Sequence, residues 1–136
     1  LALLQPLLIT QALKLLWGRV RFLHLAGDLS DYTPFWLPAG PGAGVSFPSG
    51  HVAMSMVPAP LPFFLWQRGR RLGATLAGLL VLLVGSTVAL GRIVAGKHYL
   101  SDTVFSLGLA LLLAPLLLRL RQVRGANAGS GGRKPG

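Results

Sequence analysis

The 136-residue chain is 52% hydrophobic and only 12% charged, with a mean hydropathy of +0.62, which is more apolar than an average soluble domain and favours a protein embedded in lipid. A net charge of +10 would also suit a nucleic-acid-binding protein, but the basic residues cluster between long apolar runs and form no stripe interleaved with aromatics, so nucleic acid is excluded as a partner. Cysteine is absent, which excludes disulfides, thiolate metal sites and a cysteine nucleophile.

Four apolar segments have about the length of a membrane-spanning helix, which needs about 20 residues to cross a hydrocarbon core. In chain order they are residues 1–16, 49–67, 72–90 and 99–118. The segment 72–90 carries no charge and is the clearest of the four. Pro58, Pro60 and Pro62 interrupt the second segment, and because proline removes a backbone donor we expect a kink or a break there.

These segments predict an all-α fold, a transmembrane helical bundle with about four spans in this chain. The first residue is leucine and lies inside an apolar run, so we expect the N-terminal part of the domain to precede it. We expect the membrane domain to cover residues 1–118 and a basic, Gly-rich, disordered tail to cover residues 119–136.

Two arginine clusters, at 68–71 and 119–124, predict the orientation, because basic loops stay on the cytoplasmic side. With alternating spans, the loop 22–48 would then lie at the outer face. This loop is rich in Gly and Pro and contains interfacial aromatics such as Trp36, so we name residues 22–48 the lid. The same alternation places most of the remaining ionisable residues beside it.

Lys14 and Arg21 form the first of three candidate clusters at that face. Their spacing of seven residues would place both on one face of a continuous helix, from which they could reach one anion. Arg19 would point about 140° away from Lys14 on such a helix and is left out of the cluster. Taken alone, the pair also fits basic side chains that extend to the membrane interface.

The second cluster is Pro48-Ser49-Gly50-His51, at the predicted start of a helix. The free N–H groups and the positive dipole of a helix N-terminus favour a phosphate. Ser49 has two readings, a helix cap or a phosphate ligand.

The third cluster contains Arg92, His98 and Asp102. Four residues separate His98 from Asp102, so on one helical face the carboxylate can accept a hydrogen bond from one ring nitrogen and leave the other free as a nucleophile. A purely structural ion pair is the alternative.

Phosphoryl transfer needs a nucleophile, cations on the phosphate oxygens and an acid for the leaving oxygen, and the three clusters supply all of these groups. A two-metal site would need several carboxylates, whereas the chain has no glutamate and only three aspartates, two of them in the lid. We therefore expect no metal and no other cofactor.

The patterns K-x6-R, P-S-G-H and R-x5-H-x3-D, in this order between Lys14 and Asp102, resemble the signature of the type 2 phosphatidic acid phosphatase superfamily. The resemblance implies a metal-independent phosphatase on a helical bundle, often of six spans, of which about four would be visible here. It also implies roles for single residues. His98 corresponds to the phosphorylated nucleophile, Asp102 to its orienting carboxylate and His51 to the acid, while the phosphate ligands are Lys14, Arg21, Ser49, Gly50 and Arg92.

Two positions depart from the family pattern. Phe22 stands where members have proline, and Gly91 stands where they have serine. Neither change removes a charge or a proton carrier.

The expected function is hydrolysis of a phosphate monoester or diphosphate on a lipid, through a phosphohistidine intermediate. Phosphatidate, phosphatidylglycerol phosphate, an isoprenyl diphosphate and a lipid A phosphate all stay open as substrates. The expected location is a bacterial inner or plasma membrane, with the site facing outward. A vanadate-dependent haloperoxidase, which shares this constellation, and a non-catalytic truncated membrane protein are the alternatives.

Overall fold

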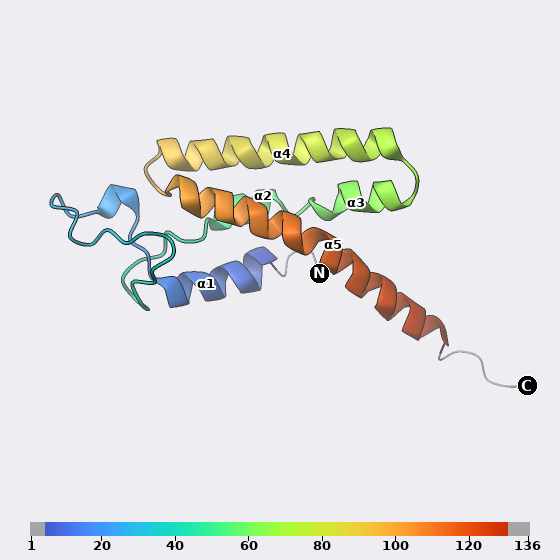
Figure 1. Cartoon of the computed structure of the whole chain (residues 1–136), viewed down its shortest axis with the longest axis horizontal. Helices are drawn as coiled ribbons and strands as arrows, with labels where there is room; N and C mark the ends of the chain where they lie inside the picture. The colour runs from blue at the N-terminus through green and yellow to red at the C-terminus, as the bar shows by residue number, and fades with distance from the viewer. Residues whose placement is uncertain (1–4, 131–136) are drawn as a thin grey trace, which may run out of the picture.

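The computed structural model describes residues 5–130, which form helices joined by turns and loops, with no strand among them (Figure 1). The all-α prediction is therefore confirmed for this part of the chain. In order the elements are the π-helix η1 (Gln5–Ile9), α1 (Thr10–Trp17), the short 3-10 helix η2 (Phe22–His24), α2 (Gly50–Ser55), α3 (Pro60–Gln67), α4 (Arg71–Val94) and α5 (Leu100–Ser130).

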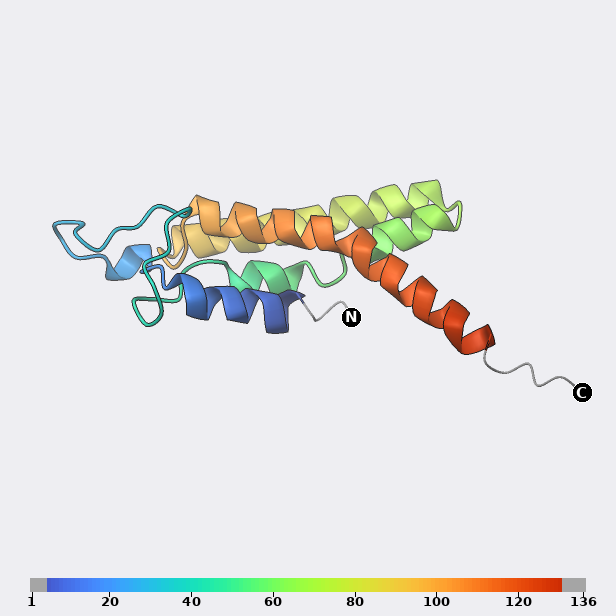
Figure 2. The same cartoon turned by 60° about the horizontal axis from the view of Figure 1, so that its bottom comes forward.

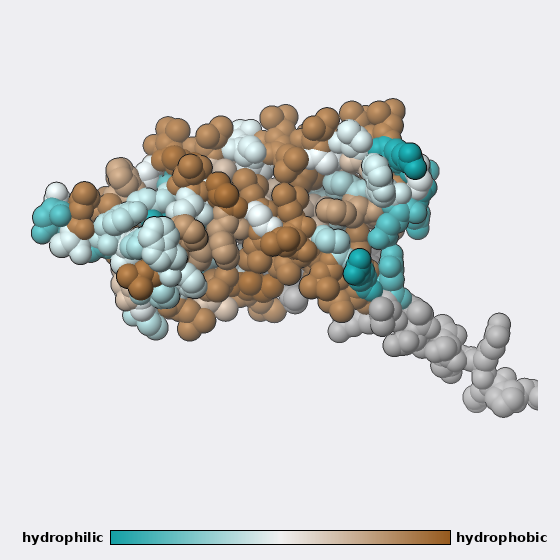
Figure 3. Space-filling view, viewed as in Figure 1, coloured by the Kyte–Doolittle hydropathy of each residue, from teal (hydrophilic) through white to brown (hydrophobic). Residues whose placement is uncertain are grey.

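Two of the described helices are long and apolar enough to cross a membrane, namely α4 and the part of α5 from Leu100 to Leu120. They correspond to the segments predicted at 72–90 and 99–118. Much of the surface in Figure 3 is apolar, and α4 exposes a row of large side chains, among them Leu72, Leu76, Leu79, Leu83 and Leu90. Such a surface is suited to lipid. The bundle of four spans stays a prediction.

The predicted interruption at the prolines is confirmed. Helix α2 ends at Ser55, residues 56–59 form a turn, and α3 starts with Pro60 in its first turn. Proline suits this position because the first N–H groups of a helix have no partner within it. The break leaves α2 and α3 as two short helices that both pack against α4.

The bundle core consists mainly of small side chains. Met56, Ala59 and Val81 are buried together with Ala110 and Ala114 of α5. A Cβ atom at Gly85 would lie 2.6 Å from the sulfur of Met56, so the absence of a side chain there lets the α2 end and α4 approach closely. Small residues at helix contacts are typical of bundles that pack in lipid.

Helix α5 continues to Ser130, so the domain boundary predicted after residue 118 falls inside this helix. Pro115 lies within α5 and removes one backbone hydrogen bond. Figure 2 shows α5 bending away from the other helices along its second half. Residues 131–136 of the predicted tail lie outside the described residues.

The lid and the connection between α4 and α5 lie at one end of the bundle, which we call the lid end (Figures 1 and 2). A backbone hydrogen bond joins them, from Leu23 N–H to the Gly96 carbonyl at 2.9 Å, and directly after the lid Ser49 N–H donates to the carbonyl of Asp102 in α5 at 3.3 Å. The connection between α3 and α4, with its arginines, lies at the opposite end (Figure 1). All three candidate clusters therefore meet at the lid end.

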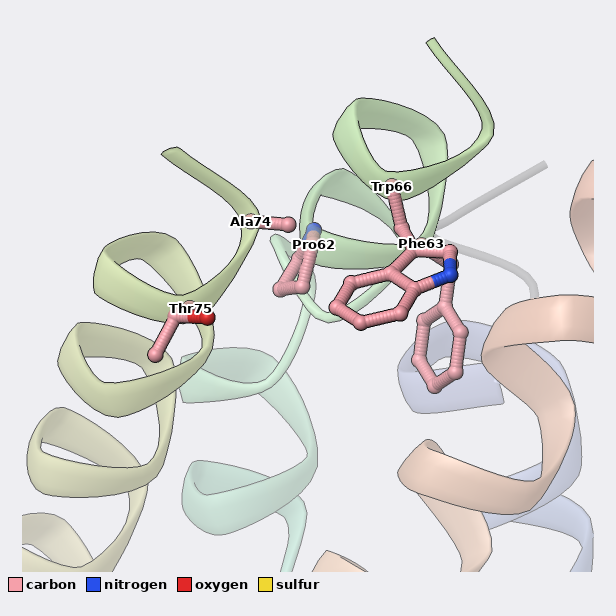
Figure 4. A pocket seen from close by; sticks show the side chains of 5 residues that line it. All are labelled: Pro62, Phe63, Trp66, Ala74 and Thr75. Carbon is pink, nitrogen blue, oxygen red and sulfur yellow. The ribbon is translucent and has the colours of Figure 1, made fainter. Parts of the chain in front are cut away.

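A cavity of about 370 Å³ opens between α3 and α4, near the arginine end of the bundle. Its lining comes from Pro62, Phe63 and Trp66 of α3 and from Ala74 and Thr75 of α4 (Figure 4). None of these side chains is ionisable, so the cavity offers no charge to a phosphate.

Candidate active site

Asp102 is the centre of the hydrogen-bond network at the lid end. Its side chain is fully buried in the first turn of α5. One carboxylate oxygen, Oδ1, accepts a hydrogen bond from Arg19 at 2.6 Å. The other, Oδ2, accepts from Ser46 Oγ at 2.5 Å and from the backbone N–H of Tyr99 at 3.1 Å.

The position of Asp102 follows from the local sequence at the start of α5. Tyr99 directly precedes the helix, and Asp102 is its third residue. A carboxylate at the third helical position commonly reaches back to the N–H of the residue before the helix, which otherwise has no partner. This contact turns the Asp102 side chain toward the residues that precede α5.

His98 is one of those residues, and it is 2% exposed. Its Nδ1 atom lies 3.6 Å from Asp102 Oδ2. The distance exceeds that of a hydrogen bond by about 0.5 Å, a common state of catalytic pairs without substrate. The prediction that both residues share a helical face is wrong, because α5 begins at Leu100 and His98 precedes it. They meet through the backward turn of the Asp102 side chain.

The assumption of a continuous helix from Lys14 to Arg21 is also wrong. Helix α1 ends at Trp17, Gly18 adopts a left-handed conformation with φ of 66°, and Arg21 is extended. Lys14 and Arg21 therefore do not share a helical face. The same error excluded Arg19, which is in fact buried and paired with Asp102. Gly18 was the available signal, since glycine after an apolar helical run commonly ends the helix.

Lys14 nevertheless lies beside the second cluster. Its Nζ donates to the Val45 carbonyl at 3.2 Å, and a Cβ atom built on Gly50 would be 3.7 Å from it. Arg21 and Arg92 are both close enough to Lys14 to repel it electrostatically. Three cations from three separate segments thus lie near one another, although like charges repel. An anion bound among them would offset that repulsion.

Buried polar atoms without a hydrogen bond concentrate at the same place. Among the described residues there are five such side-chain atoms, and four belong to the candidate clusters: Arg21 Nε, Ser49 Oγ, Arg92 Nε and His98 Nδ1. Buried donors without a partner are costly and uncommon. Ser49 stands at the cap position of α2 but its side chain makes no cap hydrogen bond, so the capping alternative is wrong. The first three of these atoms suit the oxygens of a tetrahedral oxyanion, whereas His98 Nδ1 faces Asp102.

His51 is the exposed member of the second cluster, on the first turn of α2. Partial burial, together with the positive charges of Arg92, Lys14 and Lys97, lowers the pKa of its imidazole below the usual value. His51 is therefore mostly neutral at pH 7 when no anion is bound. A bound phosphate would add negative charge beside it and favour its protonated form.

Two further basic residues of this end are not among the hydrogen-bond partners of Asp102. His24 on η2 and Lys97 before His98 are both exposed. No group of three or more His, Cys, Asp or Glu side chains in the described part of the chain is placed to hold a metal ion.

Gly18 offers a test of this arrangement. A Cβ atom there would lie 1.6 Å from the Gly40 carbonyl oxygen, and the positive φ disfavours any side chain. We expect Gly18→Ala to lower stability by at least about 2 kcal/mol. The measurement is the midpoint of thermal inactivation in detergent. Gly27→Ala is the matched control in the same connection, because a Cβ there meets nothing within 4 Å. Equal midpoints for the two variants would contradict the geometry.

Comparison with known proteins agrees with the motifs. The family model of the PAP2 superfamily, the type 2 phosphatidic acid phosphatases, matches residues 1–126. The match includes all three clusters and the lid that joins them. No curated protein and no solved structure matches the chain. Because the family model covers most of the chain, including every residue of the network around Asp102, the protein belongs to the PAP2 superfamily.

Proposed function

We propose that the protein hydrolyses a phosphate monoester or diphosphate on a lipid, through a phosphohistidine intermediate and without a metal ion. Membership of the PAP2 superfamily supports phosphatase activity on phosphate esters. One observation supports the proposal most directly. Arg21, Ser49 and Arg92 have buried polar atoms without a hydrogen bond, and at the same end of the bundle the buried His98 lies beside Asp102. This is the set of groups that phosphoryl transfer to a histidine requires.

The reaction has two steps. In the first, Nε2 of His98 attacks phosphorus, while Asp102 accepts a hydrogen bond from the Nδ1–H group and stabilises the positive ring. The bond from phosphorus to the leaving oxygen breaks, and His51 donates a proton to that oxygen. In the second step His51 takes a proton from water, and the water oxygen attacks phosphorus. The bond from phosphorus to Nε2 breaks and its electron pair returns to the ring, which releases inorganic phosphate and neutral His98. The surrounding cations balance the charge of the equatorial oxygens in both steps.

A lipid substrate is supported by the surface around the site. The clusters lie at one end of two apolar helices, α4 and α5, where a phosphate headgroup would stand if these helices cross a bilayer. The lid exposes Phe35, Trp36 and Leu37, with Trp36 69% exposed. Exposed aromatics beside apolar helices are typical of residues that contact the membrane interface.

The test is phosphate release by the protein in detergent from a panel of lipid monophosphates and diphosphates. We expect turnover that survives EDTA and is inhibited by vanadate, which mimics the pentacoordinate phosphoryl group. Loss of activity on chelation, restored by a divalent metal, would refute the metal-free route. Halide oxidation with added vanadate, and no phosphate release, would instead indicate a haloperoxidase. The absence of both phosphate release and halide oxidation would indicate a non-catalytic protein.

His51 should give the reaction a characteristic pH dependence. Because the pKa of His51 is lowered, this residue loses its proton in the free enzyme at a pH below the usual histidine range. Bound phosphate favours the protonated form, so the decline of kcat should begin at higher pH than the decline of kcat/KM. Profiles for an alkyl phosphate measure this difference.

His51→Ala should remove the alkaline decline that His51 causes, leaving only the ionisation of the substrate. Its defect should shrink with p-nitrophenyl phosphate, because that leaving group needs little protonation. An equal defect with both substrates would argue against the acid role.

We further propose a bacterial inner or plasma membrane location, with the lid end facing outward. The arginines at 68–71, at the other end of the bundle, support this orientation. Because the chain has no cysteine, single cysteines are clean probes. A cysteine at Ala43 in the lid should react with an impermeant thiol reagent in intact cells, and one at Arg70 should not. The reverse pattern would place the site in the cytoplasm.

A further inference from the structure

We infer that Arg19 is a positioning residue of this site, which holds the Asp102 carboxylate in the orientation that presents Oδ2 to His98. The inference rests on the proposed function and deepens it. Arg19 belongs to none of the three clusters, and it comes from the connection that follows α1, 83 residues from Asp102 in the chain.

The guanidinium of Arg19 is held by three hydrogen bonds and an aromatic ring. One nitrogen, Nη1, donates to Asp102 Oδ1 at 2.6 Å and to Ser101 Oγ at 2.8 Å. Nε donates to the Thr33 carbonyl of the lid at 2.9 Å. The plane lies over the Tyr99 ring, with Cζ 3.8 Å from the ring centroid, and the side chain is 2% exposed. A group fixed in this way cannot follow a moving substrate, but it can hold another side chain in place.

The contacts of Asp102 show what Arg19 contributes. If the carboxylate rotated about the Cβ–Cγ bond, its two oxygens would exchange places or both would move away from His98. Arg19 fixes Oδ1, while Ser46 and the Tyr99 N–H fix Oδ2 from other directions. The remaining side of Oδ2 is the one that faces His98 Nδ1 at 3.6 Å. The charge-assisted bond from Arg19 is the strongest type among these contacts.

Arg19 differs in this respect from the two arginines assigned to the phosphate. Both Arg21 and Arg92 have a buried Nε without a hydrogen bond, whereas the Nε and Nη1 of Arg19 are engaged with protein atoms. The structure thus separates two uses of arginine at the lid end. Two guanidinium groups are available to an anion, and the third orients the carboxylate behind the nucleophile.

The test compares Arg19→Gln with Arg21→Gln as its matched control. For Arg19→Gln we expect kcat and the rate of phosphohistidine formation to fall by about 10²-fold, as for a misplacement of about 1 Å. Its inhibition constant for vanadate should stay within about twofold of the wild type. Arg21→Gln should weaken vanadate inhibition by at least about tenfold. A merely structural role of Arg19 would lower the amount of vanadate-binding enzyme and leave kcat per binding site unchanged.

A double-mutant cycle with Asp102→Asn tests whether Arg19 acts through the carboxylate. If it does, Arg19→Gln should cause little further loss of kcat in the Asp102→Asn background. Full additivity, or a vanadate defect like that of Arg21→Gln, would overturn the inference. If Arg19→Gln does not fold, Arg19→Lys decides, because lysine keeps the charge but lacks the planar fork. The kcat of Arg19→Lys should fall while its vanadate affinity stays at the wild-type value. A wild-type kcat in this variant would overturn the inference.

Failure of the proposed function has a different signature. A wild-type protein that releases no phosphate, or that forms no phosphohistidine during turnover, refutes the function whatever the Arg19 variants do. A wild-type protein that forms the intermediate, with an Arg19→Gln variant that forms it equally fast, refutes only the role of Arg19.

Discussion

His98→Ala should abolish the covalent intermediate and lower kcat by up to about 10⁶-fold, the scale of loss for a removed nucleophile. His98 is buried beside Asp102, and its Nδ1 makes no hydrogen bond within the described part of the chain. Removing the imidazole therefore takes away the attacking Nε2 atom. It breaks no hydrogen bond of Nδ1. The cations would still bind the phosphate, so vanadate binding should persist in the variant.

The measurement is a base quench during turnover of a substrate with labelled phosphate. A phosphoramidate is stable to base and labile to acid, so the wild type should keep its label in base and lose it in acid. His24→Ala is the matched control, because His24 is exposed in the lid and lies outside the network. If His98→Ala kept the label and His51→Ala lost it, the two histidines would have to exchange roles.

Asp102→Asn should lower kcat by up to about 10⁴-fold, by analogy with the carboxylate of a serine triad. The neutral amide can donate to the ring as well as accept, so it no longer selects the tautomer whose Nε2 is free. The structure adds a second effect. Arg19 is buried and would lose its charged partner, which commonly costs about 3–5 kcal/mol.

The two effects can be measured separately. Thermal inactivation reports the stability loss, and kcat per vanadate-binding site reports the catalytic loss in the molecules that remain folded. Asp28→Asn is the control, because Asp28 is exposed and its carboxylate accepts hydrogen bonds from Ser30 in the lid. A variant with normal kcat per site and reduced stability would make the His98–Asp102 contact a structural ion pair, as the alternative reading holds.

The arrangement also explains how a short chain can gather its site at one end. Asp102 joins three segments that are distant in sequence, through Arg19 after α1, Ser46 before α2 and the Tyr99 N–H at the start of α5. The hydrogen bond from Ser46 N–H to the Arg19 carbonyl at 2.8 Å ties two of these segments directly. The carboxylate thus stabilises the lid as well as the nucleophile.

Much of the helical structure follows from local sequence alone. An apolar segment without charge, such as 72–90, satisfies its backbone groups only as a helix in lipid, and α4 spans that segment. The prolines mark a break because the missing N–H is a local property, and α3 begins at Pro60. The sequence motifs likewise named residues on the segments that the structure brings to the lid end.

Tertiary structure decided which of these residues touch. The helical angle between Lys14 and Arg19 has meaning only while the helix continues, and the left-handed turn at Gly18 ends it. Arg19 could be assigned to Asp102 only once the connection after α1 had packed against the start of α5, because the contact joins positions 83 residues apart. Spacing along the chain reports orientation within one helix. Contacts between segments depend instead on how the helices pack and where the loops return, and those are properties of the whole fold.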